Sequence, residues 1–173
     1  MKWIFIIAFA SFLTACNKPN HGDTDADTNE ETLPENNQVD RHKATEEINN
    51  FLDNWHHAAT VADEDGFYGA MTEDCIYLGT DPTEKWKRDE LRNWAVKAFE
   101  GDTAWAFTPF DRQIYLSDGA ELVWFDEKLK TWMGECRGSG IVVLTEAGWK
   151  LKHYNLAVTI TNEKIGDFMA IEQ

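Results

Sequence analysis

Four long segments of strand character follow one another in the second half of the chain, and the turns between them constrain the fold most. The turns read Ser-Asp-Gly, Lys-Thr-Trp-Met and Glu-Ala-Gly. Short connections of this kind close β-hairpins, so consecutive strands should pair in antiparallel fashion. The segments predicted as strands are residues 105–116, 120–129, 135–145 and 149–161. We therefore expect an antiparallel meander.

The residues ahead of this meander show helical periodicity. In residues 45–62 and 89–99, apolar side chains recur three or four positions apart, which places them on one face of a helix. Residues 67–71 are predicted as a short helical turn and residues 75–79 as a short strand. Helices that cover one face of a curved, mostly antiparallel sheet make an α+β fold. We expect about three such helices in one domain over residues 44–173.

The amino-terminal residues indicate export. One lysine precedes an apolar run over residues 3–13, which is too short to span a bilayer and is typical of a secretory signal. The run ends in Leu-Thr-Ala-Cys, which resembles the lipobox of bacterial lipoproteins. The resemblance implies a signal peptide over residues 1–15 and a lipid on Cys16, which would anchor the protein in the cell envelope. Because Asn17 follows, it implies the outer membrane, facing the periplasm. An ordinary secretory signal is the alternative.

Residues 16–43 are expected to form a disordered tether between the lipid and the domain. They hold almost no large apolar side chains, and Asn, Asp, Glu, Thr and Pro dominate. Such a segment cannot bury enough surface to offset the entropy lost on ordering. Two alternatives stay open: the segment could dock a partner, or it could bind metal through His21 and its acidic residues.

The charge balance excludes one class of partner. The chain carries 16 Lys and Arg against 31 Asp and Glu, a net charge of −15. So negative a protein repels nucleic-acid phosphates, and charge alone would not hold it on an anionic membrane surface. Eight tryptophans and a hydrophobic content of 43% are ample for a sizeable core or a lined cavity. Five of them could line a ligand cavity or could equally be ordinary core, namely Trp55, Trp94, Trp105, Trp124 and Trp149.

The hairpin turns also predict which side chains share a face of the sheet. If Lys-Thr-Trp-Met closes one hairpin, Asp126 lies opposite Arg137, and the next turn places Ser139 opposite Asn155. One face would then mix tryptophans and aliphatics with polar groups, which suits a partly wet pocket better than a dry core. A one-residue error in either turn would move the side chains of that strand to the opposite face of the sheet. This predicted pocket face carries Trp124, Asp126, Arg137, Ser139, His153 and Asn155, with Leu122, Ile141, Trp149 and Leu151. Either Arg112 or Gln113 could join it.

Several stretches together resemble the SnoaL-like proteins of the nuclear transport factor 2-like superfamily. They are YLGTDPTEKW, AELVWFDEKL, RGSGIVVL and GWKLKHYNLAVT, and the resemblance covers about residues 44–165. It implies a cone, in which a strongly bent sheet of about six strands wraps round a pocket that helices close. It also implies that residues 80–84 turn a small hairpin whose second strand is residues 85–87. Tyr77 and Trp86 would line the pocket.

The same resemblance bears on the two remaining cysteines. In the family's sheet order the first strand lies beside the last, and the strand with Cys136 lies beyond that. Two strand spacings, about 9–10 Å, exceed the reach of a disulfide. We therefore expect Cys75 and Cys136 to be free thiols.

Each candidate group has a structural alternative. Asp126 could exchange protons in the pocket, steadied by Arg137 or His153, or it could form a plain cross-strand ion pair with Arg137. His153 could be a general base, a ligand-orienting donor or a hydrogen-bonded core residue. Asn155 cannot shuttle protons. The segment around His56 and His57 favours a solvated helix face over a metal site, because adjacent histidines point about 100° apart on a helix.

We expect the domain to bind a small, partly apolar molecule, without metal or cofactor. The alternative is a cofactor-independent acid–base enzyme, an isomerase, dehydratase, cyclase or hydrolase, using Asp126 and His153. A third reading is a structural module with a filled cone, and the convex sheet face could form a homodimer. The residues expected to line the ligand pocket are Trp55, Tyr77, Trp86, Trp124, Arg137, Ser139 and Asn155.

Overall fold

The computed structural model describes residues 40–171. The predicted signal peptide, Cys16 and nearly all of the tether lie outside the described residues. The elements are α1 (Arg41–Thr60), α2 (Glu64–Gly69), β1 (Met71–Leu78), β2 (Lys85–Lys87), α3 (Arg88–Trp94), α4 (Val96–Phe99), β3 (Thr108–Leu116), β4 (Leu122–Thr131), β5 (Gly134–Thr145), β6 (Gly148–Val158), the 3-10 turn η2 (Asn162–Lys164) and α5 (Ile165–Ile171). Within residues 40–171, no helix has both the length and the apolar character that a membrane span requires.

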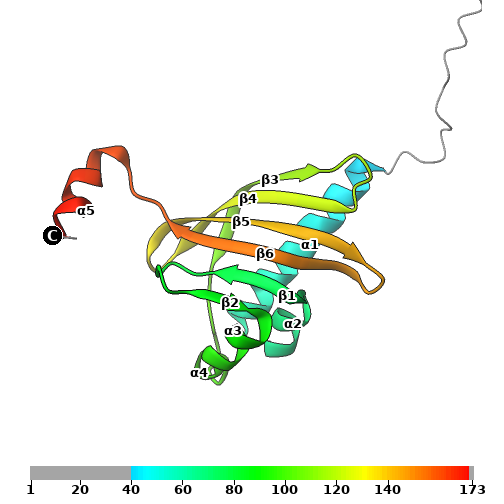
Figure 1. The fold of residues 1–173 in the computed structure, drawn as a ribbon, viewed down its shortest axis with the longest axis horizontal. Coiled ribbons are helices and arrows are strands. Elements are labelled where there is room, and N and C mark those ends of the chain that lie inside the picture. Colours follow the sequence, from blue (N-terminus) through cyan, green and yellow to red (C-terminus); the bar gives the residue numbers. More distant parts are fainter. Residues whose placement is uncertain (1–39, 172–173) are drawn as a thin grey trace, which may run out of the picture. The chain divides into compact units, whose positions relative to one another are not determined.

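All six strands form one mixed sheet in the order β2-β1-β6-β5-β4-β3. Neighbouring strands are antiparallel except β1 and β6, which run parallel. Helix α1 crosses one face of this sheet (Figure 1). The predicted α+β class, the meander and the placement of the first strand beside the last are confirmed. β6 separates β1 from β5, and Cys75 and Cys136 are free, buried thiols.

Helix α1 supplies one wall of the core. Its amino terminus is capped by Asp40, whose side chain accepts a hydrogen bond from the Lys43 amide at 3.1 Å. The apolar stripe that the sequence predicted packs against the sheet, and Ile48 and Leu52 are fully buried. Burying one such side chain stabilises the fold by about 1.5–3 kcal/mol. The opposing wall comes from alternate residues of β4, namely Val123, Phe125, Glu127 and Leu129.

The predicted pairing of Asp126 with Arg137 is wrong by two residues. Asp126 lies opposite Ser139, and Arg137 lies opposite Lys128. The hairpin turns through Trp132 and Met133 alone, rather than through four residues. Gly134 follows with a φ of 101°, as in hairpins where a type I turn is followed by a glycine of positive φ.

The predicted pairings of Ser139 with Asn155 and of Ile141 with His153 are confirmed. However, the face that they share points away from α1 and forms the outer surface of the sheet. The orientation of β4 explains this. Its odd-numbered residues Val123, Phe125 and Leu129 face α1, and burying them removes more apolar surface from water than burying the even-numbered residues would. The β5–β6 pairing also shifts register between Ile141 and Val142. Leu151 was predicted to share a face with His153, but it is buried on the inner side.

Two other local predictions need correction. The helix predicted over residues 89–99 is interrupted at Ala95, which ends α3 and caps α4. Helix α5 was not predicted, and its apolar side chains are exposed.

Candidate functional site

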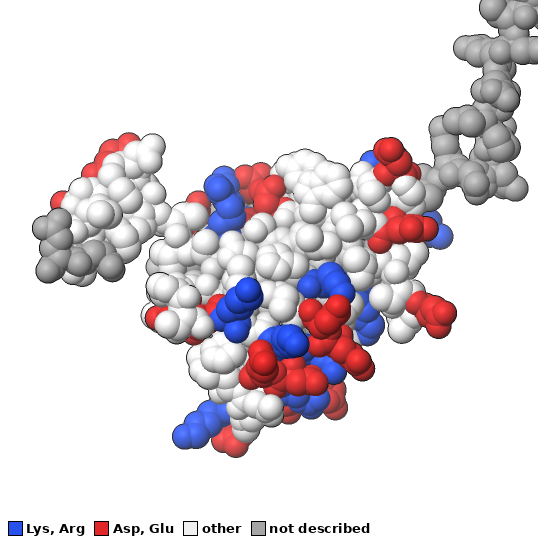
Figure 2. Space-filling model, viewed as in Figure 1, with Lys and Arg blue, Asp and Glu red and all other residues white. Residues whose placement is uncertain are grey.

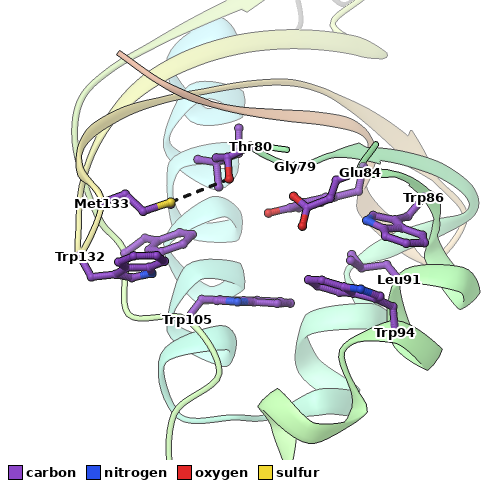
Figure 3. Close-up of a pocket in the computed structure, with 12 residues that line it drawn as sticks. Gly79, Thr80, Glu84, Trp86, Leu91, Trp94, Trp105, Trp132 and Met133 are labelled. Atoms are coloured by element: carbon purple, nitrogen blue, oxygen red, sulfur yellow. Dashed lines mark hydrogen bonds between the residues drawn. The ribbon is translucent and has the colours of Figure 1, made fainter. Parts of the chain in front are cut away.

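Four tryptophans surround a cavity of about 160 Å³ that opens to solvent beside the β1–β2 hairpin (Figure 3). Each comes from a different segment: Trp86 from β2, Trp94 from the end of α3, Trp105 from the loop after α4, and Trp132 from the β4–β5 turn. Trp94 and Trp132 keep 54% and 85% of their surface exposed. Part of each indole ring is therefore available to another molecule.

Local structure holds these rings in place. Trp86 lies opposite Tyr77 in the β1–β2 ladder, and its ring stacks on that of Trp94 at 5.4 Å. The loop that carries Trp105 is fixed to the end of α1, since the amides of Ala104 and Trp105 both donate to the Ala59 carbonyl. The position of Trp132 in a tight turn explains its exposure.

Of the carboxylates in the described part of the chain, Glu84 alone lines this cavity. Its Oε2 accepts a hydrogen bond from the Asp81 amide at 3.2 Å. The ion pairs found among residues 40–171 do not include Glu84. Burial, and after it the charge of Glu84, raise the pKa of Tyr77 above its ordinary value. The cavity thus combines aromatic walls with one negative group.

A buried polar network lies behind the cavity wall. Tyr77 lines the cavity, and its ring lies 5.5 Å from that of Tyr154. The Tyr154 hydroxyl donates to Glu127 at 3.2 Å. Glu127 is completely buried, lies 2.7 Å from His56 Nε2, and accepts from Arg112 Nε at 2.8 Å. Arg112 also pairs with Asp53 at 2.8 Å.

The partners of Glu127 keep it ionised. Burial raises its pKa, but the hydrogen bonds and charges of His56 and Arg112 outweigh burial and leave the pKa below the ordinary value. Burial, followed by the charge of Glu127, raises the pKa of Tyr154 well above its ordinary value. The network therefore holds one carboxylate charged and one phenol neutral. A His–Glu pair can serve acid–base chemistry, but here His56 and Glu127 are buried and hydrogen-bonded to each other.

Sequence reasoning missed this network. The solvated helix face predicted around His56 and His57 holds for His57 only, because His56 is buried against Glu127. Arg112 points inward because the β3–β4 register shifts between Phe110 and Gln113, where Asp111 has a φ of 52°. Such a bulge redirects side chains and has no reliable sequence signal. The one available signal was Glu127 itself, an acidic residue at an inward position between Phe125 and Leu129.

The residues predicted to form the site are divided by the structure. Tyr77 and Trp86 line the tryptophan cavity. Trp55 is buried in the core, where it stacks on Phe67 at 5.1 Å. The remaining predicted residues lie on the outer face of the sheet: Trp124, Asp126, Arg137, Ser139, His153 and Asn155. Asp126 accepts from the Tyr115 hydroxyl at 3.3 Å. The catalytic roles predicted for Asp126 and His153 stay predictions.

The described residues offer no obvious metal centre. Within residues 40–171, no three His, Cys, Asp or Glu side chains gather in a way that could hold a metal ion. Burial raises the pKa of the Cys75 thiol to about 12, so this thiol is a poor nucleophile or ligand near neutral pH.

A sequence model of the SnoaL-like domain matches residues 48–161. The chain belongs to the SnoaL-like domain family. No curated protein matches it.

Solved structures share this SnoaL-like fold at low sequence identity. An NTF2-like protein of unknown function from Pseudomonas putida KT2440 has 12% identity and a TM-score of 0.59, covering 71% of this chain and 92% of its own. A candidate aromatic ring hydroxylase from Novosphingobium aromaticivorans has 17% identity and a TM-score of 0.58, covering 69% and 92%. A candidate dehydratase from Streptomyces avermitilis has 9% identity and a TM-score of 0.59, covering 69% and 99%. At these identities the likeness shows the fold alone.

Proposed function

We propose that this SnoaL-like domain binds a small, partly apolar molecule that contacts the four tryptophans of the cavity. The observation that carries the proposal is the exposure of Trp94 and Trp132 around a cavity that their neighbours leave open. Covering exposed indole rings with a ligand removes apolar surface from water, which favours binding. A concave site with apolar walls and few polar groups is the usual form of a small-molecule site.

Calorimetric titration of the full chain with indole, a neutral ring compound, tests the proposal. Trp94→Ala and Trp132→Ala should each weaken binding by about three- to tenfold, because each removes one aromatic contact. The matched control is Trp124→Ala, which removes a ring of similar exposure (45%) from the outer sheet face and should leave binding unchanged. Equal loss in all three variants would count against the cavity.

The alternative function, an acid–base enzyme using Asp126 and His153, stays a prediction. Both residues lie on the outer face of the sheet, so a substrate would have to bind there rather than in the tryptophan cavity. Asp126→Asn and His153→Ala separate the two functions. An enzyme of this kind loses turnover with both substitutions, whereas indole binding in the cavity survives them.

We further propose that the domain is tethered to the cell envelope, at the outer membrane, through lipid on Cys16. The support is the apolar run over residues 3–13 and the Leu-Thr-Ala-Cys sequence that follows it. The wild-type protein should then sediment with membranes. After processing, its first residue should be Cys16, and this residue should carry the mass of the acyl groups. Cys16→Ser should release it into the soluble fraction. A wild-type protein that is soluble after export would contradict the anchor.

A further inference from the structure

We propose that the ligand carries a methylated ammonium group, and that this cation occupies the space between the four tryptophans and Glu84. The inference rests on the proposed function and names the chemistry that the cavity recognises. A cation is attracted to the electron-rich face of an aromatic ring, and indole is the strongest such ring in proteins. A site of several aromatic rings with one acidic group is therefore suited to a cation.

The arrangement of the rings supports this chemistry. Figure 3 shows Trp132, Trp105, Trp94 and Trp86 bordering one open space, with the Glu84 carboxylate directed at its side. Because the four rings come from four separate segments, a ligand among them can contact rings from several directions. The sulfur of Met133, a soft and polarisable atom, completes the wall near Trp132.

Glu84 supplies the charge. Its carboxylate accepts from one backbone amide, that of Asp81, and forms no ion pair with a side chain of residues 40–171. Among residues 40–171, those that line the cavity include no Lys, Arg or His. An anionic ligand would thus meet an uncompensated negative charge, whereas a cation would neutralise it.

The backbone is shaped to leave room for this carboxylate. A Cβ atom at Gly79 would lie 2.0 Å from Glu84 Oε2, far inside contact distance. Only glycine at this position allows Glu84 to keep its place beside the cavity. The hairpin itself is held independently, since the Gly79 amide donates to the Glu84 carbonyl at 3.0 Å.

The walls favour a methylated ammonium over a primary amine. A primary ammonium is strongly hydrated and seeks several hydrogen-bond acceptors, of which Glu84 is one and the indole faces provide none. Methyl groups replace that hydration with apolar surface and keep the charge. The cavity volume of about 160 Å³ corresponds to about five water molecules in the liquid. That space fits a head group and leaves the rest of the ligand near the exposed Trp132.

Calorimetric titration of the full chain with choline and with 3,3-dimethylbutan-1-ol tests the proposal. The second compound has the same shape, with carbon in place of the charged nitrogen. Choline should bind about tenfold more tightly than this neutral isostere, because only the cation gains from the rings and from Glu84. Ethanolamine, which carries a primary ammonium, should bind more weakly than choline.

Two variants locate the effect. Glu84→Gln keeps an oxygen that can accept from the Asp81 amide but removes the charge, so it should weaken choline several-fold and leave the isostere unchanged. Gly79→Ala should weaken choline by displacing the carboxylate while the net charge is kept. The control is Glu121→Gln, which removes the same charge at an exposed position before β4 and should leave choline binding unchanged.

The outcomes separate this inference from the proposed function. Equal binding of choline and its isostere, or a choline affinity that Glu84→Gln leaves unchanged, would overturn the proposal of a cationic ligand. The proposed function would survive, with a neutral molecule as the ligand of the cavity. If ethanolamine bound more tightly than choline, the proposal of a methylated ammonium would be overturned in favour of a primary amine. Failure of choline, the isostere and indole alike at millimolar concentration would overturn the proposed function as well.

Discussion

At the scale of single residues, the molecule separates a buried charge from an accessible one. Glu127 is enclosed and hydrogen-bonded to His56, Arg112 and Tyr154, so its charge is compensated inside the protein. Glu84 faces a cavity and has only a backbone donor. The first arrangement serves the folded state, and the second is available for a ligand.

Removing the charge of Glu127 should destabilise the protein. Glu127→Gln leaves the Arg112 guanidinium buried without this counter-charge, which should lower the free energy of unfolding by about 3–5 kcal/mol at neutral pH. Urea unfolding measures the change. The matched control is Asp126→Asn on the outer face, next in sequence, which should cost far less. If Glu127→Gln lowered the free energy of unfolding no more than Asp126→Asn does, the network would contribute nothing to stability.

The acid dependence of stability should follow the same group. The pKa of Glu127 is lower in the folded protein than its ordinary 4.5. Its contribution is therefore fully present above about pH 4.5 and is lost as the pH falls through the lower, folded-state pKa. The wild-type protein should lose stability over this acid range, and Glu127→Gln should show a shallower loss. Parallel curves for the two proteins would contradict the assignment.

At the scale of elements, local sequence patterns predicted most of the fold. Turn residues located the four long strands, helical periodicity located α1, and the resemblance to SnoaL-like proteins located β2. The face of the sheet could not be predicted, because the strict alternation of β4 fits two orientations. The sequence shows that Trp124 and Asp126 share a face, but not that Val123 and Phe125 gain more by burial.

The candidate site was harder to predict, because its residues come together only in the folded chain. Tyr77 and Trp86 were assigned to a pocket by resemblance, and Trp94 and Trp105 were predicted either to line a cavity or to be ordinary core. Trp132 was not predicted, and all of these rings meet only through tertiary packing. Adjacency in sequence does not show that a loop after α4 and the β4–β5 turn approach the same hairpin. The sequence predicts residues 80–84 only as a hairpin turn and does not show that Glu84 lines a cavity.

Helix α5 should be dispensable for the fold. Ile165, Phe168, Met169 and Ile171 are all at least 40% exposed, so α5 buries little apolar surface. Truncation after residue 164 should change the free energy of unfolding by less than about 0.5 kcal/mol. Thermal unfolding of the truncated chain measures this. A large fall in melting temperature would show that α5 packs on the domain.

At the scale of the whole molecule, the two faces of the sheet differ in what covers them. The inner face packs on α1, and the cavity opens beside the β1–β2 hairpin. The visible face in Figure 2 has a largely uncharged area over β4 and β5, with acidic and basic side chains mixed over β1 and α3. Apolar side chains are exposed on this outer face, including Leu122, Trp124 and Tyr115. An apolar area of this kind is a candidate contact surface.

We predict that this outer face forms a homodimer. Trp124→Glu places a charge in the middle of the apolar area and should shift the protein toward the monomer. Sedimentation equilibrium of the full chain, with its anchor removed by Cys16→Ser, measures the association. A wild-type chain that stays monomeric at high concentration would contradict the dimer, and the ligand cavity would be unaffected.

Native mass spectrometry of the gently purified full chain shows whether the tryptophan cavity holds a small molecule. We expect a mass excess that disappears on denaturation, and that is absent from the Trp94→Ala, Trp132→Ala double variant but present in Trp124→Ala. A chain without any adduct, which also fails to take up added indole or choline, would show that the cone has no ligand.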